Sequence, residues 1–118
     1  MLLISPQSII WVATQPVDFR KGITGLIAVC QQKLGQDPLQ GAIFLFYSKN
    51  RIALKILCFD GQGFWLITKR LSEQRFKRPI APDKNLPAHK ICYRSLQTLV
   101  NNGDPVAAQF SKNWKQFN

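Results

Sequence analysis

Hydrophobic and polar positions along the chain change from strand-like runs to helical spacing and back. Residues 9–14 are rich in β-branched and aromatic side chains, which is typical of a strand. Over residues 19–34 apolar side chains recur every three or four positions, which predicts an amphipathic helix. Asp18 stands where the N-cap of that helix is expected, and Gly35 ends the pattern. A strand followed by a helix is therefore predicted for the first third of the chain.

The middle of the chain predicts three consecutive strands. The apolar runs 42–47 and 51–59 are joined by a short polar segment, which is typical of a hairpin. The turn signal at residues 60–63 then leads into a third run, 64–70. Within the second run, side chains alternate between two faces, and only the face that carries Lys55 admits a charge. We expect an antiparallel meander with the helix over 19–34 as its cover.

Beyond residue 70 the pattern is less regular. Prolines interrupt residues 71–87, a long basic loop of the kind that is usually functional or mobile. A short strand is predicted around Lys90 to Cys92, and a short helix follows, which Asn101-Asn102-Gly103 ends. Residues 105–118 form an amphipathic tail, either helical or mobile, that contacts its own domain or a partner.

Together these elements predict a single α+β domain over residues 1–104, followed by the tail. The expected fold is an antiparallel sheet of about four to five strands with the three-strand meander at its centre. One main N-terminal helix covers the sheet, and the second helix near the C-terminus is short.

Composition changes the picture through charge. The chain has 118 residues, of which 46% are hydrophobic, and its sixteen Lys and Arg against six acids give a net charge of +10. Such a field attracts polyanions because neutralised phosphates release their counterions, although the same charge could serve solubility alone. The three cysteines are far apart and odd in number, which favours buried free thiols in a reducing compartment. No basic leader and no membrane-length apolar run is visible, so we expect a cytoplasmic protein with no membrane contact.

Catalytic chemistry finds little support in the residue pattern. His89 is the only histidine, has no acidic neighbour in sequence, and is interpreted as a loop residue. Most of the carboxylates have local roles in caps and turns, and a nuclease would need several of them around divalent metal. Asp60 precedes Gly61 and is first a turn residue. We predict no enzyme activity, no cofactor, no metal site and no small-molecule substrate.

A cluster of cations is the more specific signal. It combines basic side chains with nearby aromatic residues, Trp65 and Phe76, and this mixture suits phosphate contacts and base stacking. The alternative is a solvated strand end whose charges protect a sheet edge from aggregation. The predicted nucleic-acid-binding residues are Lys55, Trp65, Lys69, Arg70, Arg75, Lys77 and Arg78, with Arg20 and Lys21 as a second patch.

The chain also resembles a known family in the order and spacing of several short motifs. They are Asp18 to Leu26, Asn50-Arg51, Leu54 to Leu57, Phe59 to Leu66, Lys69-Arg70-Leu71, Arg75-Phe76 and Pro79. These residues resemble the TnpB-type accessory protein, the second-reading-frame product of the insertion-sequence group numbered sixty-six. Arg78, where an aromatic residue is common, and Cys92, where a Ser or Thr cap is usual, depart from the pattern.

The resemblance implies a bacterial mobile-element protein that works beside a separate DDE transposase. No catalytic residue is carried over from it. We expect a non-enzymatic accessory factor that binds DNA, at element ends or non-specifically, and assists the transposase. The alternative is a protein-interaction module that docks on the transposase, through residues 18–26 and the apolar tail, with little direct DNA contact.

Overall fold

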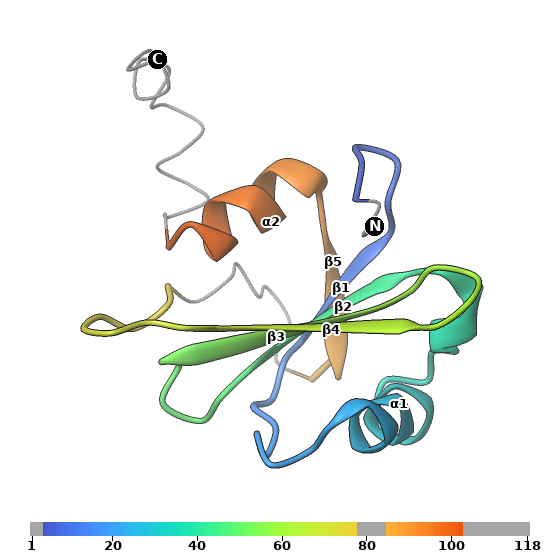
Figure 1. Cartoon of the computed structure of the whole chain (residues 1–118), viewed down its shortest axis with the longest axis horizontal. Coiled ribbons are helices and arrows are strands. Elements are labelled where there is room, and N and C mark those ends of the chain that lie inside the picture. Colours follow the sequence, from blue (N-terminus) through green and yellow to red (C-terminus); the bar gives the residue numbers. More distant parts are fainter. Residues whose placement is uncertain (1–3, 78–84, 103–118) are drawn as a thin grey trace.

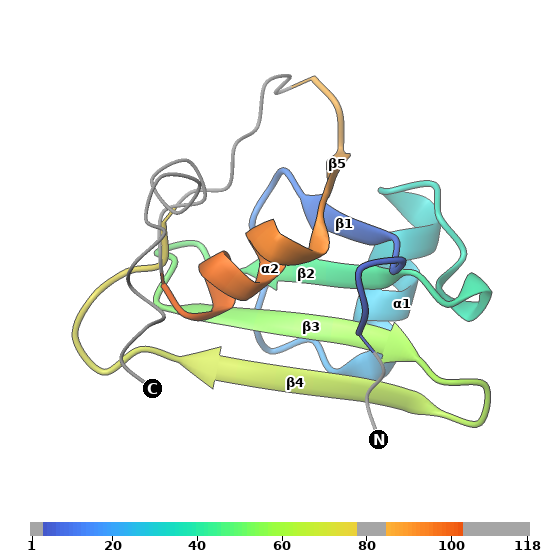
Figure 2. The same cartoon turned by 90° about the horizontal axis from the view of Figure 1, so that it is seen from above.

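The computed structural model describes residues 4–77 and 85–102. One five-stranded sheet organises it (Figure 1), and the strands lie in the order β4-β3-β2-β1-β5 (Figure 2). The strands are β1 (Ile10–Ala13), β2 (Ile43–Tyr47), β3 (Ala53–Phe59), β4 (Phe64–Arg70) and β5 (Ala88–Ile91). The predicted meander is confirmed, since β2, β3 and β4 pair antiparallel in sequence order. The predicted antiparallel sheet is wrong at one pair, because β1 and β2 run parallel. A parallel pair needs a crossover connection, and the helix between these two strands supplies it.

Two helices cover opposite faces of the sheet, which Figure 1 shows edge-on. The first, α1 (Ile23–Gln32), buries Leu26 against a core that includes Leu57 of β3. The second, α2 (Tyr93–Val100), buries Leu96 in another core that includes Leu54 of β3. Because successive strand residues point to opposite faces, β3 contributes to both cores. The prediction that the first helix covers the sheet is confirmed. The second helix covers the opposite face of the sheet.

The segment before α1 differs from its prediction. The helix begins at Ile23 after the N-cap Gly22, which makes no side-chain cap. The prediction that Asp18 caps this helix is therefore wrong. Its carboxylate instead accepts a hydrogen bond from the Arg20 amide at 2.9 Å and pairs with the Arg20 guanidinium at 2.7 Å. Gly35 adopts a left-handed φ of 65° after the helix, as its position predicted. A 3-10 turn, η1 (Pro38–Gln40), then leads to β2.

The C-terminal elements follow the prediction in type. The strand around residue 90 is β5, which pairs with β1, and the short helix is α2. His89 lies half-buried in β5 and not in a loop, and burial lowers the pKa of its imidazole. Cys30 and Cys58 are buried, but Cys92 is exposed because it is the N-cap of α2, where its sulfur accepts a hydrogen bond from the Ser95 amide.

Some predictions concern residues outside the described part of the chain. Arg78 and the tail over residues 105–118 both lie there. Within residues 4–77 and 85–102, no helix has the length and apolar character to cross a bilayer.

Candidate nucleic-acid interface

One end of the sheet carries a group of cations. Strand register places Ala53 opposite Arg70 at one end of the β3–β4 pair and Phe59 opposite Phe64 at the other. Asp60 follows β3 at the second end, and Asp37 caps η1 just before β2 begins there. The first end, which we call the basic end, carries the described cations Lys49, Arg51, Lys69, Arg70, Arg75 and Lys77. Glu73 is the one acid in the same connections among the residues that the structure describes.

Lys69 and Arg70 are neighbours in sequence but have different environments. Because strand residues alternate, Lys69 faces the α2 side of the sheet and Arg70 the α1 side. The Lys69 ammonium donates to the carbonyl of Val100 at 2.7 Å, at the C-terminal end of α2. Arg70 is exposed and has no hydrogen-bond or ion-pair partner within the described residues. Arg70 is therefore available to a ligand, whereas Lys69 supports the helix end.

The connection after β4 is held to the sheet by Phe76. This side chain is 1% exposed and packs edge-on against Tyr47, with ring centroids 6.1 Å apart. Its amide donates to the carbonyl of Arg51 at 2.7 Å, and the Arg51 guanidinium donates back to the Phe76 carbonyl at 3.1 Å. Phe76 is thus buried and cannot stack on bases, but it fixes the exposed cations Arg75 and Lys77 on either side.

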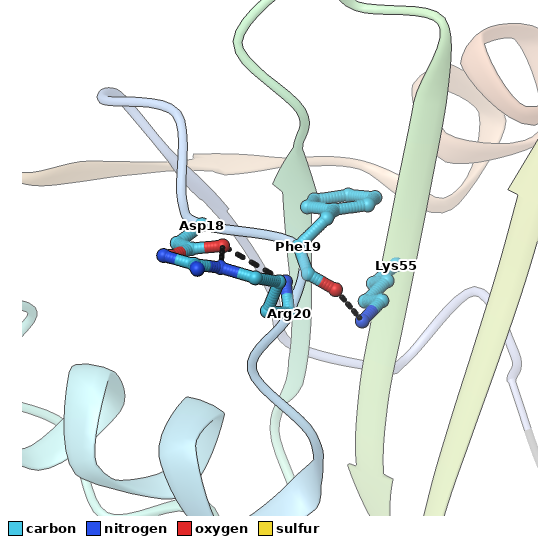
Figure 3. A network of polar contacts seen from close by, with 4 residues as sticks. All are labelled: Asp18, Phe19, Arg20 and Lys55. Atoms are coloured by element: carbon cyan, nitrogen blue, oxygen red, sulfur yellow. Dashed lines mark hydrogen bonds and ion pairs between the residues drawn. The ribbon is translucent and has the colours of Figure 1, made fainter.

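Lys55 lies in the interior and is 9% exposed. Its ammonium donates to the carbonyl of Phe19 at 2.9 Å and lies 4.9 Å from the centre of the Phe19 ring (Figure 3). It also donates to the carbonyl of Lys21 at 2.8 Å. The expectation that Lys55 contacts phosphate does not fit this position. The buried ammonium instead attaches residues 19–21 to the sheet, and we remove it from the proposed contacts.

The second predicted patch is exposed but partly neutralised. Arg20 forms its ion pair with Asp18 at the surface, and its side chain is 91% exposed. The hydrogen bonds from Arg20 lower the pKa of the Asp18 carboxyl to about 2, so this acid stays ionised at neutral pH. Lys21 is exposed beside it.

Trp65 lies away from the basic end. It pairs with Cys58 across the sheet and is 37% exposed. Its indole N–H donates to the Asp60 carboxylate at 2.8 Å, and the other oxygen of Asp60 accepts the amides of Gln62 and Gly63 at 2.9 Å each. These bonds lower the pKa of Asp60 to about 2. The interpretation of Asp60 as a turn residue agrees with this geometry.

The structure thus brings together a smaller set than the sequence predicted. Arg70, Arg75 and Lys77 are exposed at the basic end, and Lys49 in the β2–β3 connection joins them. Sequence reasoning missed Lys49 because a lysine in a short polar turn is indistinguishable from a solubilising residue. The register of the hairpin is what places it near Arg70. In the described part of the chain, no group of three or more His, Cys, Asp or Glu residues is arranged to hold a metal ion.

Two curated relatives match much of the chain. The uncharacterized protein y4jC of Sinorhizobium fredii (strain NBRC 101917 / NGR234) is 45% identical over 74 residues, which is 63% of this chain and 63% of y4jC. The uncharacterized protein y4hO of the same organism is 40% identical over 81 residues, 68% of this chain and 70% of y4hO. No solved structure matches the chain.

The profile of one protein family, described as IS66 Orf2 like protein, matches residues 8–109. This span includes all the strands and helices described above, and it extends beyond the last described residue. The chain therefore belongs to the IS66 Orf2-like family, in agreement with the resemblance found in its short motifs.

Proposed function

We propose that the protein is a non-enzymatic accessory factor in transposition that binds DNA through its basic end and assists the transposase of the same element. The observation that carries the proposal is the group of exposed cations at the basic end. Arg70, Arg75 and Lys77 are exposed there and have no hydrogen-bond or ion-pair partner among the described residues. Family membership supports the accessory role.

The geometry favours phosphate contacts over base reading. The cations come from the β2–β3 connection, the end of β4 and the loop after it, so they form a surface and not a row along one helix. Such a surface neutralises backbone charge, which gives affinity that depends on salt and little on sequence. Arg78, in the same stretch of sequence, and the Arg20–Lys21 patch remain proposed additional contacts, and element ends are the proposed target.

The test compares two variants with the same net charge. One neutralises the basic end by Arg70→Gln, Arg75→Gln and Lys77→Gln together. The other, its control, carries Lys33→Gln, Lys90→Gln and Arg94→Gln, three exposed cations outside the basic end. Duplex-DNA affinity is measured at several salt concentrations. We expect the basic-end variant to lose more than about tenfold in affinity and about 2.7 in the salt slope, because each phosphate contact contributes about 0.9.

Two results would contradict the proposal. Equal losses in both variants would mean that net charge alone drives binding. If the wild-type protein does not bind duplex DNA at low salt, the proposed DNA contact is wrong. If the transposase still co-purified with the basic-end variant in that case, the protein would be a docking module for the transposase.

A further inference from the structure

A hollow of about 860 Å³ lies on the α1 side of the sheet at the basic end. The segment over residues 16–19 and the β2–β3 connection line it, together with Arg70 of β4. It exists because α1 packs over Leu57, and residues 19–21 are tied down over Lys55, so that the end of β3 near Ala53 has no helix above it. Ala53 is only 4% exposed, so the segment over residues 16–19 and the β2–β3 connection form most of the accessible surface of the hollow.

The lining of the hollow combines an apolar surface with free positive charge. Pro16, Phe19 and Ile52 are exposed or half-buried and contribute apolar surface, and Phe19 supplies an aromatic ring. Lys49 and Arg70 also line it, and neither has a partner among the described residues. A ligand that fits this lining has a flat apolar part and an anionic group next to it.

We propose that the hollow takes the base of an unpaired nucleotide in DNA, with the adjacent phosphates bound by Lys49 and Arg70. This inference rests on the proposed function and adds a substrate class to it. A base must be unpaired because a paired base is enclosed in the duplex stack and cannot enter a protein hollow. Apolar and aromatic surfaces that accept base faces beside cations that follow the backbone are the usual means of single-strand binding.

An acidic peptide is the other ligand that free cations could attract, and the lining disfavours it. Asp18 also lines the hollow, where Arg20 holds it ionised. A peptide with consecutive carboxylates would place some of them beside Asp18, whereas in a nucleic-acid strand neutral bases alternate with the phosphates and can lie beside Asp18 while the phosphates bind Lys49 and Arg70. The cations Arg75 and Lys77 near the same end would continue the contact along a nucleic-acid backbone.

The experiment uses the full chain and two DNA probes of one sequence. One probe is fully paired, and the other has a single-stranded gap of about four nucleotides, the smallest site size of a single-strand binding fold. We expect the gapped probe to bind roughly tenfold more tightly at the same salt concentration. Ala53→Ile adds carbon atoms to the lining of the hollow without changing charge and should abolish this preference while duplex binding stays unchanged.

Further variants keep the result interpretable. Val17→Leu narrows the hollow from its other wall without adding an aromatic ring and should weaken the preference as Ala53→Ile does. Thr24→Ile, on the exposed surface of α1 and outside the lining, is the matched control and should keep the preference. Thermal unfolding confirms that each variant is folded before binding is measured.

Each outcome decides the proposal. Loss of the preference in both filling variants but not in Thr24→Ile supports it. Duplex binding without any preference, or a preference that both filled hollows retain, overturns it and leaves the proposed function intact. Absence of binding to either probe overturns both. A last outcome is that an acidic, leucine-containing probe peptide binds tightly, that Ala53→Ile abolishes this binding, and that gapped DNA is not preferred. This outcome would assign the hollow to a peptide and overturn the proposal of a nucleotide site.

Discussion

Lys55 is a charged residue whose ammonium is buried inside the protein. A lysine in an apolar strand is expected to extend to solvent, since lysines are rarely buried without a partner. Here its partners are two backbone carbonyls and an aromatic ring, so no acid is needed nearby. The ammonium satisfies carbonyl groups of a segment that has no regular secondary structure. Its role is to hold residues 19–21 in front of α1.

Replacing this ammonium should destabilise the protein. Lys55→Met keeps the length of the side chain but removes the donor to the carbonyls of Phe19 and Lys21. We expect the free energy of unfolding in urea to fall by about 1–3 kcal/mol, because hydrogen bonds from a charged group are lost. Lys49→Met is the control, because the exposed Lys49 side chain has no described partner. This change should alter the free energy of unfolding by less than about 0.5 kcal/mol. Equal effects of the two changes would refute the structural role of Lys55.

The lowered pKa of Asp60 implies that the stability of the protein depends on pH. The turn amides and the Trp65 indole hold its folded pKa at about 2, below the ordinary value of 3.8. A depressed pKa means that the ionised group stabilises the folded state above pH 4, and that this contribution is lost as pH falls towards 2. Asp60→Asn cannot titrate, so its stability should fall less steeply than that of the wild type over this range. Urea unfolding at a series of pH values measures the two slopes, and identical slopes would contradict the prediction.

At the scale of elements, the end of β4 serves two purposes through adjacent residues. Lys69 bonds the last turn of α2 on one face, and Arg70 is exposed on the other. Cations are favourable at a helix C-terminus because the final carbonyls carry partial negative charge. The alternation of a strand therefore divides a basic dipeptide into a structural and a free cation. Reversing the charge of Lys69 together with that of Arg70 would therefore change both the stability of the protein and its DNA binding, and the two effects could not be separated.

The two roles can be separated by matched substitutions. Lys69→Met should lower the free energy of unfolding by about 1 kcal/mol, because the carbonyl of Val100 loses its charged donor. Arg70→Met should leave stability within about 0.5 kcal/mol, since Arg70 has no described partner, but should weaken duplex binding. Chemical denaturation and a DNA titration of both variants give the comparison. A larger stability loss from Arg70→Met than from Lys69→Met would reverse the assignment.

At the scale of the whole molecule, the sheet separates two cores and each has its own helix. Both cores are built from buried residues within the described ranges, with α1 over one face and α2 over the other. The boundary predicted from the sequence, a domain over residues 1–104 and a tail beyond it, stays a proposal. It is consistent with a sheet that is covered on both faces before residue 103.

Truncation tests this boundary. A chain that ends after Asp104 should unfold with the same thermal midpoint as the full chain, within about 2 °C, because shifts of that size correspond to less than about 0.5 kcal/mol in a domain of this length. It should also keep its duplex affinity, since the exposed cations Arg70, Arg75 and Lys77 precede the cut. A large fall in the thermal midpoint would show that the tail belongs to the domain.

Local pattern was enough to predict the elements. The three-strand meander, the turn at Asp60 and the left-handed Gly35 follow from alternation and turn chemistry, which act between near neighbours in sequence. The cluster of cations after β4 was likewise visible, but the sequence could not tell which members were free. Phe76 could be read equally well as a stacking residue or as a core residue until its contact with Tyr47 was known.

The sequence by itself therefore determined the strands, the helices, the meander and the sign of the charge, because each depends on residue type and spacing. Tertiary structure decided which strand lies beside β1, which face each helix covers, and which cations remain free. Those outcomes depend on contacts between distant segments, such as Lys55 with residues 19–21 and Lys69 with Val100. Spacing along the chain carries no information about such pairs, and they reduced the predicted basic surface to the smaller set at the basic end.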